Sequence, residues 1–522
     1  MSNTTNSTNN LINLLEAKTS FSKTTIQNIL KLLEEGCTIP FIARYRKDLT
    51  SNATDEQLRD FEEIYNYSLK LLSRKEEIIS ILKERNFLDD KLLHHINEAA
   101  TLQILEDIYA PFKDKKSSRT SEAIEKGLEP LANIIQSMKY SLEEINQKAK
   151  QFLNKDVESI EDAIQGASDI IAQRYADDFR TKELIRNSVL NYGTIETKKT
   201  KTFNANGLYA NFADISEKIK YIKSYRFLAI LRAVNEKELT LKIEVDEDYM
   251  LENIKKYKIP ASANTSSKLV FEAYKDGLKR LLLPSLKRET LTLLKEKASS
   301  EAITLFGKNL KELLLTPPLV NQVILGMDPG YVSGCKLAVI DENGNYLASN
   351  VIYPTKPKED FANSSKVVLE LIKKYKINSI AIGNGTASQE TAAFIAKLIE
   401  EHKLDVRFAV VSEIGASVYS ASKIANLEYP NLDVTIRGAI SIAQRLRDPM
   451  AALVKIDPKS LGIGQYQHDV NQKELNLKLE NVTVDLVNKV GVDLNSASYK
   501  LLSFISGISE KLALNIIEHK EK

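Results

Sequence analysis

The spacing of hydrophobic positions changes along the chain, and the first stretch is helical throughout. Over residues 11–190, apolar side chains recur three and four positions apart, as at Ile26, Ile29 and Leu33. This period places them on one face of a helix, and strand-like alternation is nearly absent. We therefore predict an all-helical region over 11–190, after a disordered tail at 1–10 that is rich in Ser, Thr and Asn.

A mixed connecting segment is expected over 191–263, where turn signals such as Asn206-Gly207 border alternating runs such as Leu239–Ile243. A helical pattern returns over 264–316. Pro284 interrupts it. Because proline lacks a backbone donor and clashes with the preceding turn, we expect a kink or a break there.

Beyond Thr316-Pro317-Pro318, helical and strand patterns alternate, which predicts an α/β domain over 320–455. The first three strands should form a meander, with a hairpin turn at Asp341–Asn345. The expected strands are 323–327, 335–340, 346–353, 379–382 and 406–411, and the expected helices are 366–376 and 388–402. A connecting segment (456–484), rich in turn residues over 457–469, and a last segment (485–522), helical from Asn495, follow. The predicted fold is multi-domain, mostly helical at first and α/β later.

Composition narrows the class of protein. The 72 basic and 70 acidic residues leave a net charge of +2, so any nucleic-acid surface must be a local patch. Two cysteines exclude a disulfide framework and a cysteine-rich zinc site. No apolar run approaches ~18 residues, and the N-terminus lacks a basic stretch followed by an apolar core. These features predict a cytosolic protein with no membrane partner.

Two carboxylates follow apolar strands of the predicted α/β domain. Asp328 lies in Gly326-Met327-Asp328-Pro329-Gly330, and Glu413 follows the run Phe408–Val411. Two such groups at strand ends of one sheet could bind a divalent metal for phosphodiester cleavage. Each alone is more often a plain turn residue.

Two glycine-containing segments could present backbone amides to an anion. Gly383-Asn384-Gly385-Thr386 lies at a strand-to-helix junction, where a helix N-terminus attracts negative charge; a simple tight turn is an equal alternative. The segment Phe504–Ala513 predicts a hairpin between two short helices, with Gly507, Ile508, Ser509 and Lys511 placed to meet a phosphate. Its alternative is an ordinary αα-hairpin.

Two clusters of cations could contact a nucleic-acid backbone. One lies on the helical segment after 264, and the other lies in a predicted loop. The candidates are Lys279, Arg280, Lys287 and Arg288 on the helix, and Lys113, Lys115, Lys116 and Arg119 in the loop. The alternative for the helix is a solvated face, which is the more common meaning of a charge run.

Several long motifs occur in one order and resemble the bacterial Tex family, the transcription accessory proteins that bind RNA. The resemblance runs from about residue 11 to the end. The motifs are Thr38–Lys47, Leu105–Lys113, Gly326–Gly330, Ile382–Ser388, Ser412–Ser420, Val454–Ser460 and Gly464–Asp469.

The resemblance implies an all-helical N-terminal region with a helix-turn-helix part, a central long helix and a YqgF/RuvC-like domain of RNase H type. It also implies tandem helix-hairpin-helix motifs, with a partial one over 485–522. The family's C-terminal OB-fold RNA-binding domain follows those motifs, whereas this sequence stops at Lys522 inside the first unit. The resemblance thus implies a chain truncated before the OB fold.

The resemblance also bears on catalysis. Asp328 and Glu413 match the first two acidic positions of the RNase H-type fold, but Arg437 stands where the third carboxylate is expected. A cation there repels Mg²⁺ and could serve as a phosphate or structural charge instead. Asp433 and Asp448 could in principle substitute as third ligand.

We therefore favour a scaffold in transcription that binds RNA and, as a second candidate, DNA, with no cofactor. The alternative is a nuclease that uses Mg²⁺ or Mn²⁺. A third hypothesis is a protein-interaction platform whose helical N-terminus docks on polymerase or ribosome.

Overall fold

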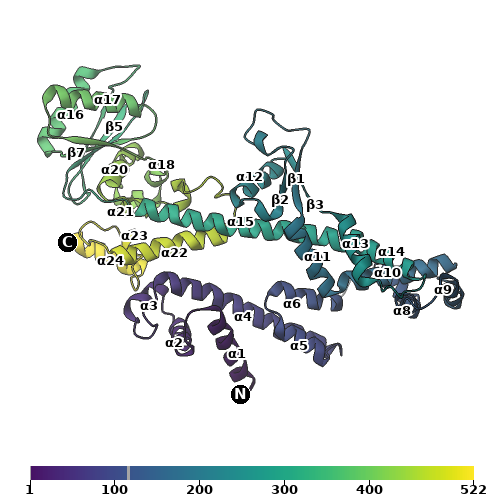
Figure 1. Ribbon diagram of the computed structural model, residues 1–522. Coiled ribbons are helices and arrows are strands. Elements are labelled where there is room, and N and C mark those ends of the chain that lie inside the picture. Colours follow the sequence, from purple (N-terminus) through teal and green to yellow (C-terminus); the bar gives the residue numbers. More distant parts are fainter. Residues whose placement is uncertain (1, 114–117, 522) are drawn as a thin grey trace. The chain divides into compact units, whose positions relative to one another are not determined.

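The computed structural model describes residues 2–113 and 118–521, and they form two compact units (Figure 1). The first unit contains the chain up to Ile26 together with Asp60–Ser299. The second contains Gln27–Arg59 and the residues from Ser300 onward. No helix of the described residues is long and apolar enough to cross a membrane.

The first unit is mainly helical, as predicted. Polar residues begin many of its helices: the side chain of Ser159, for example, accepts a hydrogen bond from the Asp162 amide, one of the donors that a helix N-terminus leaves unpaired. The α-helices that lie wholly within this unit and precede its sheet are α1 (Ser2–Lys18), α5 (Asp90–Glu98), α6 (Leu102–Tyr109), α7 (Arg119–Glu125), α8 (Glu129–Gln136), α9 (Leu142–Ala149), α10 (Ile160–Asp177) and α11 (Phe179–Tyr192). Helices α2 (Lys23–Glu34) and α4 (Asp55–Glu84) span the unit boundary.

The N-terminal tail differs from the expectation of disorder, because residues 2–10 form the first part of α1. Leu11, Ile12 and Leu15 of this helix are buried. A helical turn that is already fixed by packing can be extended at little cost, since each further residue adds one hydrogen bond.

The mixed segment contains a small antiparallel sheet of order β2-β1-β3. Its strands are β1 (Thr194–Lys199), β2 (Ser216–Lys218) and β3 (Leu239–Glu244), and helix α12 (Ser224–Asn235) connects β2 to β3 through the 3-10 turn Ile219–Tyr221. The strand predicted at Leu239–Ile243 is confirmed. Helix α13 (Glu247–Lys258) follows.

The helical path near Pro284 is continuous, so the expected break does not occur, and a π-helical turn lies directly before α15. Helix α14 (Ser267–Asp276) continues through a π-helical turn, Gly277–Leu282, into α15 (Leu283–Leu314). Pro284 lies in the first turn of α15. The wider π turn before it accommodates the missing proline donor, so the distortion takes the form of a π segment.

The α/β domain lies in the second unit and contains a five-stranded sheet of order β6-β5-β4-β7-β8. Strands β4 to β6 form the predicted antiparallel meander, whereas β4, β7 and β8 run parallel. The elements are β4 (Ile324–Asp328), β5 (Cys335–Ile340), β6 (Tyr346–Ile352), α16 (Phe361–Tyr375), β7 (Ser379–Gly383), α17 (Ser388–His402) and β8 (Arg407–Val411). They confirm the five predicted strands and both helices.

The two faces of the sheet have separate cores. Leu325 and Met327 of β4 pack with residues of α16 and α17 on one face. Ile324 packs with α20 (Val434–Arg447) on the other (Figure 1). Because side chains alternate along a strand, Gly326 and Asp328 point toward α20.

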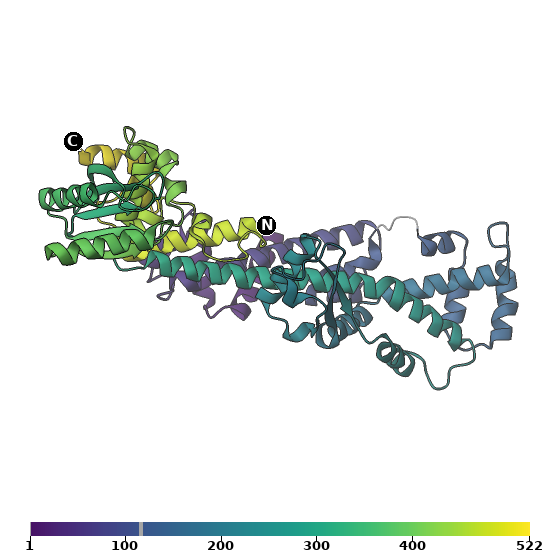
Figure 2. The ribbon, with the colours of Figure 1, turned by 90° about the horizontal axis from the view of Figure 1, so that it is seen from above.

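Helices complete the second unit. They are α3 (Ile39–Tyr45), α18 (Ala416–Ser420), α19 (Lys423–Glu428), α21 (Pro449–Leu453), α22 (Gln472–Val490), α23 (Tyr499–Leu502) and α24 (Glu510–Glu521), with a 3-10 turn at Pro458–Leu461. Helix α22 lies along the C-terminal half of α15 (Figures 1 and 2). Gly307 of α15 faces Lys478 and Val482 of α22 at ordinary contact distance.

A buried ionic network joins three helices of the first unit. The carboxylate of Asp107 (α6), 4% exposed, accepts from Lys182 Nζ and Arg186 Nη2 (α11), both at 2.5 Å. Arg186 also pairs with Glu289 of α15. Each charge is met by an opposite charge, as burial requires.

Replacing Arg186 should therefore be strongly destabilising, because Arg186→Met leaves the carboxylate of Glu289 unpaired and weakens the pairing of Asp107. We expect a loss of about 3 kcal/mol in the free energy of unfolding, measured by urea denaturation. The control is Lys113→Met, which removes a more exposed ion pair with Glu106 and should cost at most ~1 kcal/mol. Equal losses for the two variants would contradict a special role of the buried network.

Candidate nucleic-acid interface and acidic pocket

The acidic pair lies at one edge of the sheet. Asp328 ends β4, and Glu413 follows β8. Since β4, β7 and β8 are parallel, their carboxyl ends share that edge. The charge of Glu413 acts on Asp328, and a β-carbon on Gly438 of α20 would lie 3.1 Å from Asp328 Oδ2. The structure thus brings the two predicted carboxylates together beneath α20.

The predicted glycine turn holds a carboxylate of the protein itself. A β-carbon built on Gly385 would lie 1.8 Å from Glu413 Oε1, and one on Gly383 would lie 2.7 Å from Oε2. The Glu413 amide donates to Asn384 Oδ1 at 3.0 Å. Glycines at both positions leave the space that the Glu413 side chain fills.

Two cations that the sequence reasoning missed lie beside this pair. Lys336 is opposite Asp328 in the β4–β5 register, and its Nζ donates to the carbonyls of Ser333 and Gly334. Arg445 of α20 is 6% exposed and donates to the Ser412 carbonyl at 2.6 Å, while its Nε and Nη2 have no hydrogen-bond partner among the residues that the structure describes. A lysine inside the apolar run Cys335–Ile340 was the available signal for Lys336.

Burial dominates the electrostatics of this pocket. Burial and, to a smaller extent, the charge of Glu413 raise the pKa of Asp328, Lys336 opposes both, and the net result is a pKa of about 6. Burial lowers the pKa of the Arg445 guanidinium to about 10, against the influence of Glu413. Arg445 therefore remains charged at neutral pH.

Arg437, and not a carboxylate, occupies the position at which a third acidic residue would accompany Asp328 and Glu413. Arg437 is buried and donates to the Tyr429 and Ser420 carbonyls and to Asn426 Oδ1. Asp433 and Asp448 are occupied as the N-caps of α20 and α21, where they accept hydrogen bonds from backbone amides. Among residues 2–113 and 118–521, no cluster of three or more His, Cys, Asp or Glu side chains could hold a metal ion.

The predicted hairpin between α23 and α24 presents an exposed backbone. Gly507 has φ +90°, and a β-carbon there would meet nothing within 4 Å. Ser509 caps α24 by accepting from the Leu512 amide. Gly507, Ser509 and Lys511 are exposed, and Ile508 is half-buried. In the described part of the chain, no acceptor is recorded for the amides of Gly507, Ser509, Glu510 and Lys511.

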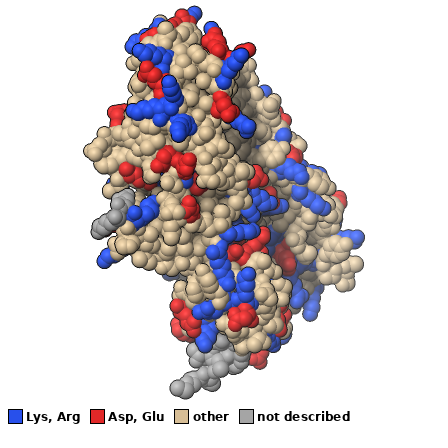
Figure 3. Space-filling model, turned by 90° about the vertical axis from the view of Figure 1, so that its left-hand side faces the viewer, with Lys and Arg blue, Asp and Glu red and all other residues tan. Residues whose placement is uncertain are grey.

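The predicted basic helix is largely neutralised by acidic neighbours. Lys279 pairs with Glu247 at 2.9 Å, which raises the pKa of Lys279. Arg280 pairs with Asp276 and Asp169. Of the other two predicted cations, Lys287 has its Nζ 4.0 Å from the Glu244 carboxylate, and Arg288 donates a hydrogen bond to the Pro284 carbonyl. The face shown in Figure 3 likewise has acidic and basic side chains interspersed.

The predicted cationic loop is described only in part. Lys113 pairs with Glu106 at 2.5 Å. Arg119 is exposed at the start of α7. Lys115 and Lys116 lie outside the described residues, so their side chains add nothing to the comparison.

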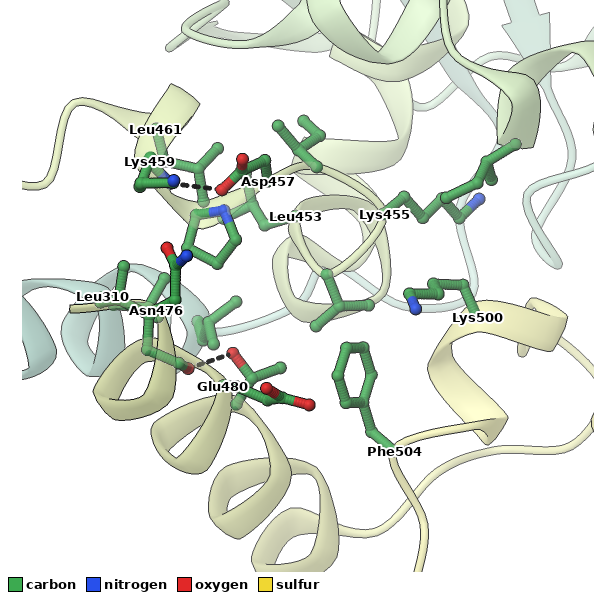
Figure 4. Close-up of a pocket in the computed structure, with 17 residues that line it drawn as sticks. Leu310, Leu453, Lys455, Asp457, Lys459, Leu461, Asn476, Glu480, Lys500 and Phe504 are labelled. Atoms are coloured by element: carbon green, nitrogen blue, oxygen red, sulfur yellow. Dashed lines mark hydrogen bonds between the residues drawn. The ribbon is translucent and has the colours of Figure 1, made fainter. Parts of the chain in front are cut away.

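A pocket of about 430 Å³ lies between the end of α15, the 453–461 segment, α22 and the hairpin region (Figure 4). Its walls are largely apolar. The Lys500 ammonium lies over the Phe504 ring, 5.1 Å from its centroid, and within 3.6 Å of Glu510. Lys455 is paired with Glu428 at 2.9 Å. The pocket is therefore not a concentrated cationic site.

An RNase H-type sheet followed by a helix-hairpin-helix hairpin defines a class of multi-domain proteins, and both modules are consistent with nucleic-acid binding. Family models match the chain in the same order. They are the Tex-like protein N-terminal domain (residues 9–83), the Tex central region-like model (142–306), the Tex protein YqgF-like domain (322–447) and the helix-hairpin-helix motif (487–522).

The chain is similar to several known proteins over nearly all of its own length. The transcriptional accessory protein Tex of Neisseria gonorrhoeae is 38% identical over 98% of this chain and 68% of its own length. YdcI of Bacillus subtilis is 39% identical over 95% of this chain and 70% of its own length. The human S1 RNA-binding domain-containing protein 1 is 33% identical over 98% of this chain and 53% of its own length. The chain belongs to the Tex family of transcription accessory proteins.

The acidic pocket predicts an unusual pH dependence. An unfolded Asp has a pKa near ~3.9, so the folded state, with Asp328 at about 6, binds more protons between these values. The contribution of Asp328 to the free energy of unfolding should then fall as pH rises from about 4 to about 6. Asp328→Asn should stabilise the protein by roughly 1–2 kcal/mol above pH 7, allowing for partial exposure, and should have little effect below pH 4.

The measurement is calorimetric unfolding across this pH range. The control residue is Asp433, the N-cap of α20. Hydrogen bonds from Thr435 lower the pKa of Asp433, so the ionised Asp433 stabilises the folded state. Asp433→Asn should therefore become less stable than wild type as pH rises, which is the opposite of the effect expected for Asp328→Asn. An Asp328→Asn variant that is less stable than wild type at pH 7.5 would contradict a net cost of burying this charge.

The contact between the Glu413 carboxylate and the glycine turn can be tested by a double-mutant cycle. Gly385→Ala should cost about 1–3 kcal/mol in unfolding free energy, because its new methyl overlaps the Glu413 carboxylate. In a Glu413→Ala background this cost should largely disappear. Gly307→Ala, which meets only ordinary contacts inside α15, should be neutral or stabilising by up to ~1 kcal/mol. Additive effects of Gly385→Ala and Glu413→Ala would refute the proposed contact.

Proposed function

We propose that this protein binds RNA, and DNA as a second substrate, through sequence-independent contacts to backbone phosphates, and that it acts as a scaffold in transcription. The family and the two nucleic-acid-type modules support the class of ligand. The names of two relatives, a transcriptional accessory protein and an S1 RNA-binding domain-containing protein, support RNA as the ligand and transcription as the process.

The observation that carries the proposal is the open hairpin before α24. The amides of Gly507, Ser509 and Glu510 lie just before and at the N-terminus of α24, whose partial positive charge attracts a phosphate. Gly507 adds no side chain that could obstruct approach, and Lys511 adds an exposed positive charge. Such donors contact the phosphate and not the base edges, so binding would be independent of sequence.

A binding role suits the acidic pocket better than hydrolysis does. Two-metal phosphodiester cleavage needs several carboxylates around the ions. Here two carboxylates are accompanied by Lys336 and Arg445, and the candidate third ligands are helix caps. The fixed cations supply the charge neutralisation that metal ions would otherwise provide.

A substitution at the hairpin cap tests phosphate binding without unfolding the helix. Ser509→Asp retains an N-cap acceptor but places a negative charge where the phosphate would lie. We expect binding of a labelled RNA hairpin to weaken about tenfold or more in fluorescence anisotropy at ~50 mM salt, with the melting temperature unchanged. Lys511→Gln should reduce the slope of log affinity against log salt by about one.

The matched control is Ser422→Asp, because Ser422 caps α19 in the same way, by accepting from the Ala425 amide. That variant should bind RNA as wild type does. Unchanged affinity of Ser509→Asp would remove the hairpin from the interface. Cleavage of labelled RNA or DNA with Mn²⁺, abolished by Asp328→Asn, would refute the scaffold role in favour of a nuclease.

A further inference from the structure

An exposed segment of the first unit alternates lysines with tyrosines. It covers residues 218–226, Lys-Ile-Lys-Tyr-Ile-Lys-Ser-Tyr-Arg, and we refer to it as the Lys-Tyr segment. It runs from the last residue of β2 through the 3-10 turn into the first turn of α12. Tyr221 is 67% and Tyr225 is 65% exposed, and all three lysines of the segment, Lys218, Lys220 and Lys223, are also exposed.

The segment is firmly anchored beneath these exposed side chains. Ile219 is buried, and its amide donates to the Gly193 carbonyl at 3.0 Å. Gly193 lies so close that a β-carbon there would be 2.9 Å from Ile219 Cδ1. Phe227 of α12, two residues after Tyr225, is also buried. The fold therefore presents Tyr221 and Tyr225 from a fixed backbone.

The same anchor brings a further aromatic residue to this surface. Tyr192 ends α11 directly before Gly193, and it is 65% exposed. The bond between Ile219 and Gly193 holds the end of α11 against the 3-10 turn. Three exposed tyrosines thus come from two segments that meet at Gly193.

The lysines of the segment carry charge that the protein does not neutralise. Within the part of the chain that the structure describes, no acidic group lies within ion-pair distance of Lys218, Lys220 or Lys223. The neighbouring Glu217 is paired with Arg226 at 2.8 Å. This contrasts with the basic helix at Lys279 and Arg280, whose cations each have a carboxylate partner. The surface is positive where the sequence did not draw attention to it.

The combination matches one kind of polyanion. Lysines attract phosphates, and flat aromatic rings stack on bases that are free of pairing. A duplex keeps its bases stacked inside, so it could contact the lysines through its phosphates but could not stack on the tyrosine rings. A single strand offers both groups in alternation along its length, as the segment does.

We propose that the Lys-Tyr segment, with Tyr192, is a stacking platform for single-stranded nucleic acid. It rests on the proposed function in that it supplies a second contact, specific for unpaired bases, in addition to phosphate binding at the hairpin. Tyr221 and Tyr225 stack on bases, while Lys218, Lys220 and Lys223 contact the flanking phosphates. An anionic membrane surface, which also attracts Lys and Tyr, is the competing occupant.

The test compares single-stranded and duplex RNA on the full chain. A labelled oligo(U) and a blunt RNA duplex of equal length are titrated by fluorescence anisotropy against wild type, Tyr221→Ala/Tyr225→Ala and Tyr221→Phe/Tyr225→Phe. Removing the rings should weaken oligo(U) binding by roughly tenfold or more and leave duplex binding within about twofold. The phenylalanine variant should retain wild-type affinity, because the stacking face is kept.

A matched control uses an exposed tyrosine of α13 in the same unit, Tyr249, which follows the acidic residues Asp246, Glu247 and Asp248. Tyr249→Ala should bind oligo(U) as wild type does. Photocrosslinking with 4-thiouridine in the oligonucleotide, followed by mass spectrometry, should place crosslinks in the peptide that contains Tyr221 and Tyr225. Circular dichroism of each variant verifies folding.

The outcomes separate the two proposals. If Tyr221→Ala/Tyr225→Ala binds oligo(U) as tightly as wild type, the platform is refuted, whatever the hairpin variant Ser509→Asp does. If Ser509→Asp has no effect while the tyrosine variant loses oligo(U), the hairpin proposal fails and the platform stands. If the tyrosine variant loses only binding to phosphatidylserine vesicles in cosedimentation, the occupant is a membrane and the platform is again refuted.

Discussion

The arrangement of charge in this protein follows from the cost of burying it. A buried carboxylate or guanidinium is tolerated where an opposite charge or a hydrogen-bond donor meets it. Asp107, Arg186 and Glu289 satisfy this condition by joining three helices, and Lys455 satisfies it by pairing with Glu428. Because such pairs consume cations, they also determine which lysines and arginines remain available to an external polyanion.

The same constraint explains the acidic pocket of the RNase H-type domain. Asp328 and Glu413 share a partly buried edge of the sheet, where two carboxylates repel each other and need compensating positive charge. Lys336 and Arg445 provide it from β5 and α20. The pocket is thus electrostatically tolerable through its own side chains, and the glycine turn that could have accepted an external anion is filled by Glu413.

The parts of the structure that local pattern controls could be predicted from the sequence. The five strands of the sheet are short apolar runs bounded by turns, and Asp328 and Glu413 could be brought together because parallel strands share an edge. Pairings between distant segments could not be predicted, since Lys279 and Glu247 are joined only by tertiary structure. The exposure of a side chain also depends on tertiary structure. A tyrosine such as Tyr221 can be buried or exposed in a folded protein, and here Ile219 is buried while Tyr221 is exposed.

Two kinds of contact would give such a protein two different responses to salt. The phosphate contacts proposed at the hairpin would release counterions, so their contribution would fall steeply as salt concentration rises. Base stacking on an aromatic ring releases none and persists at high salt. A chain with a net charge of only +2 has little long-range attraction for nucleic acid, and its selectivity must therefore come from local geometry. Rings held beside unpaired lysines would favour a single strand over a duplex.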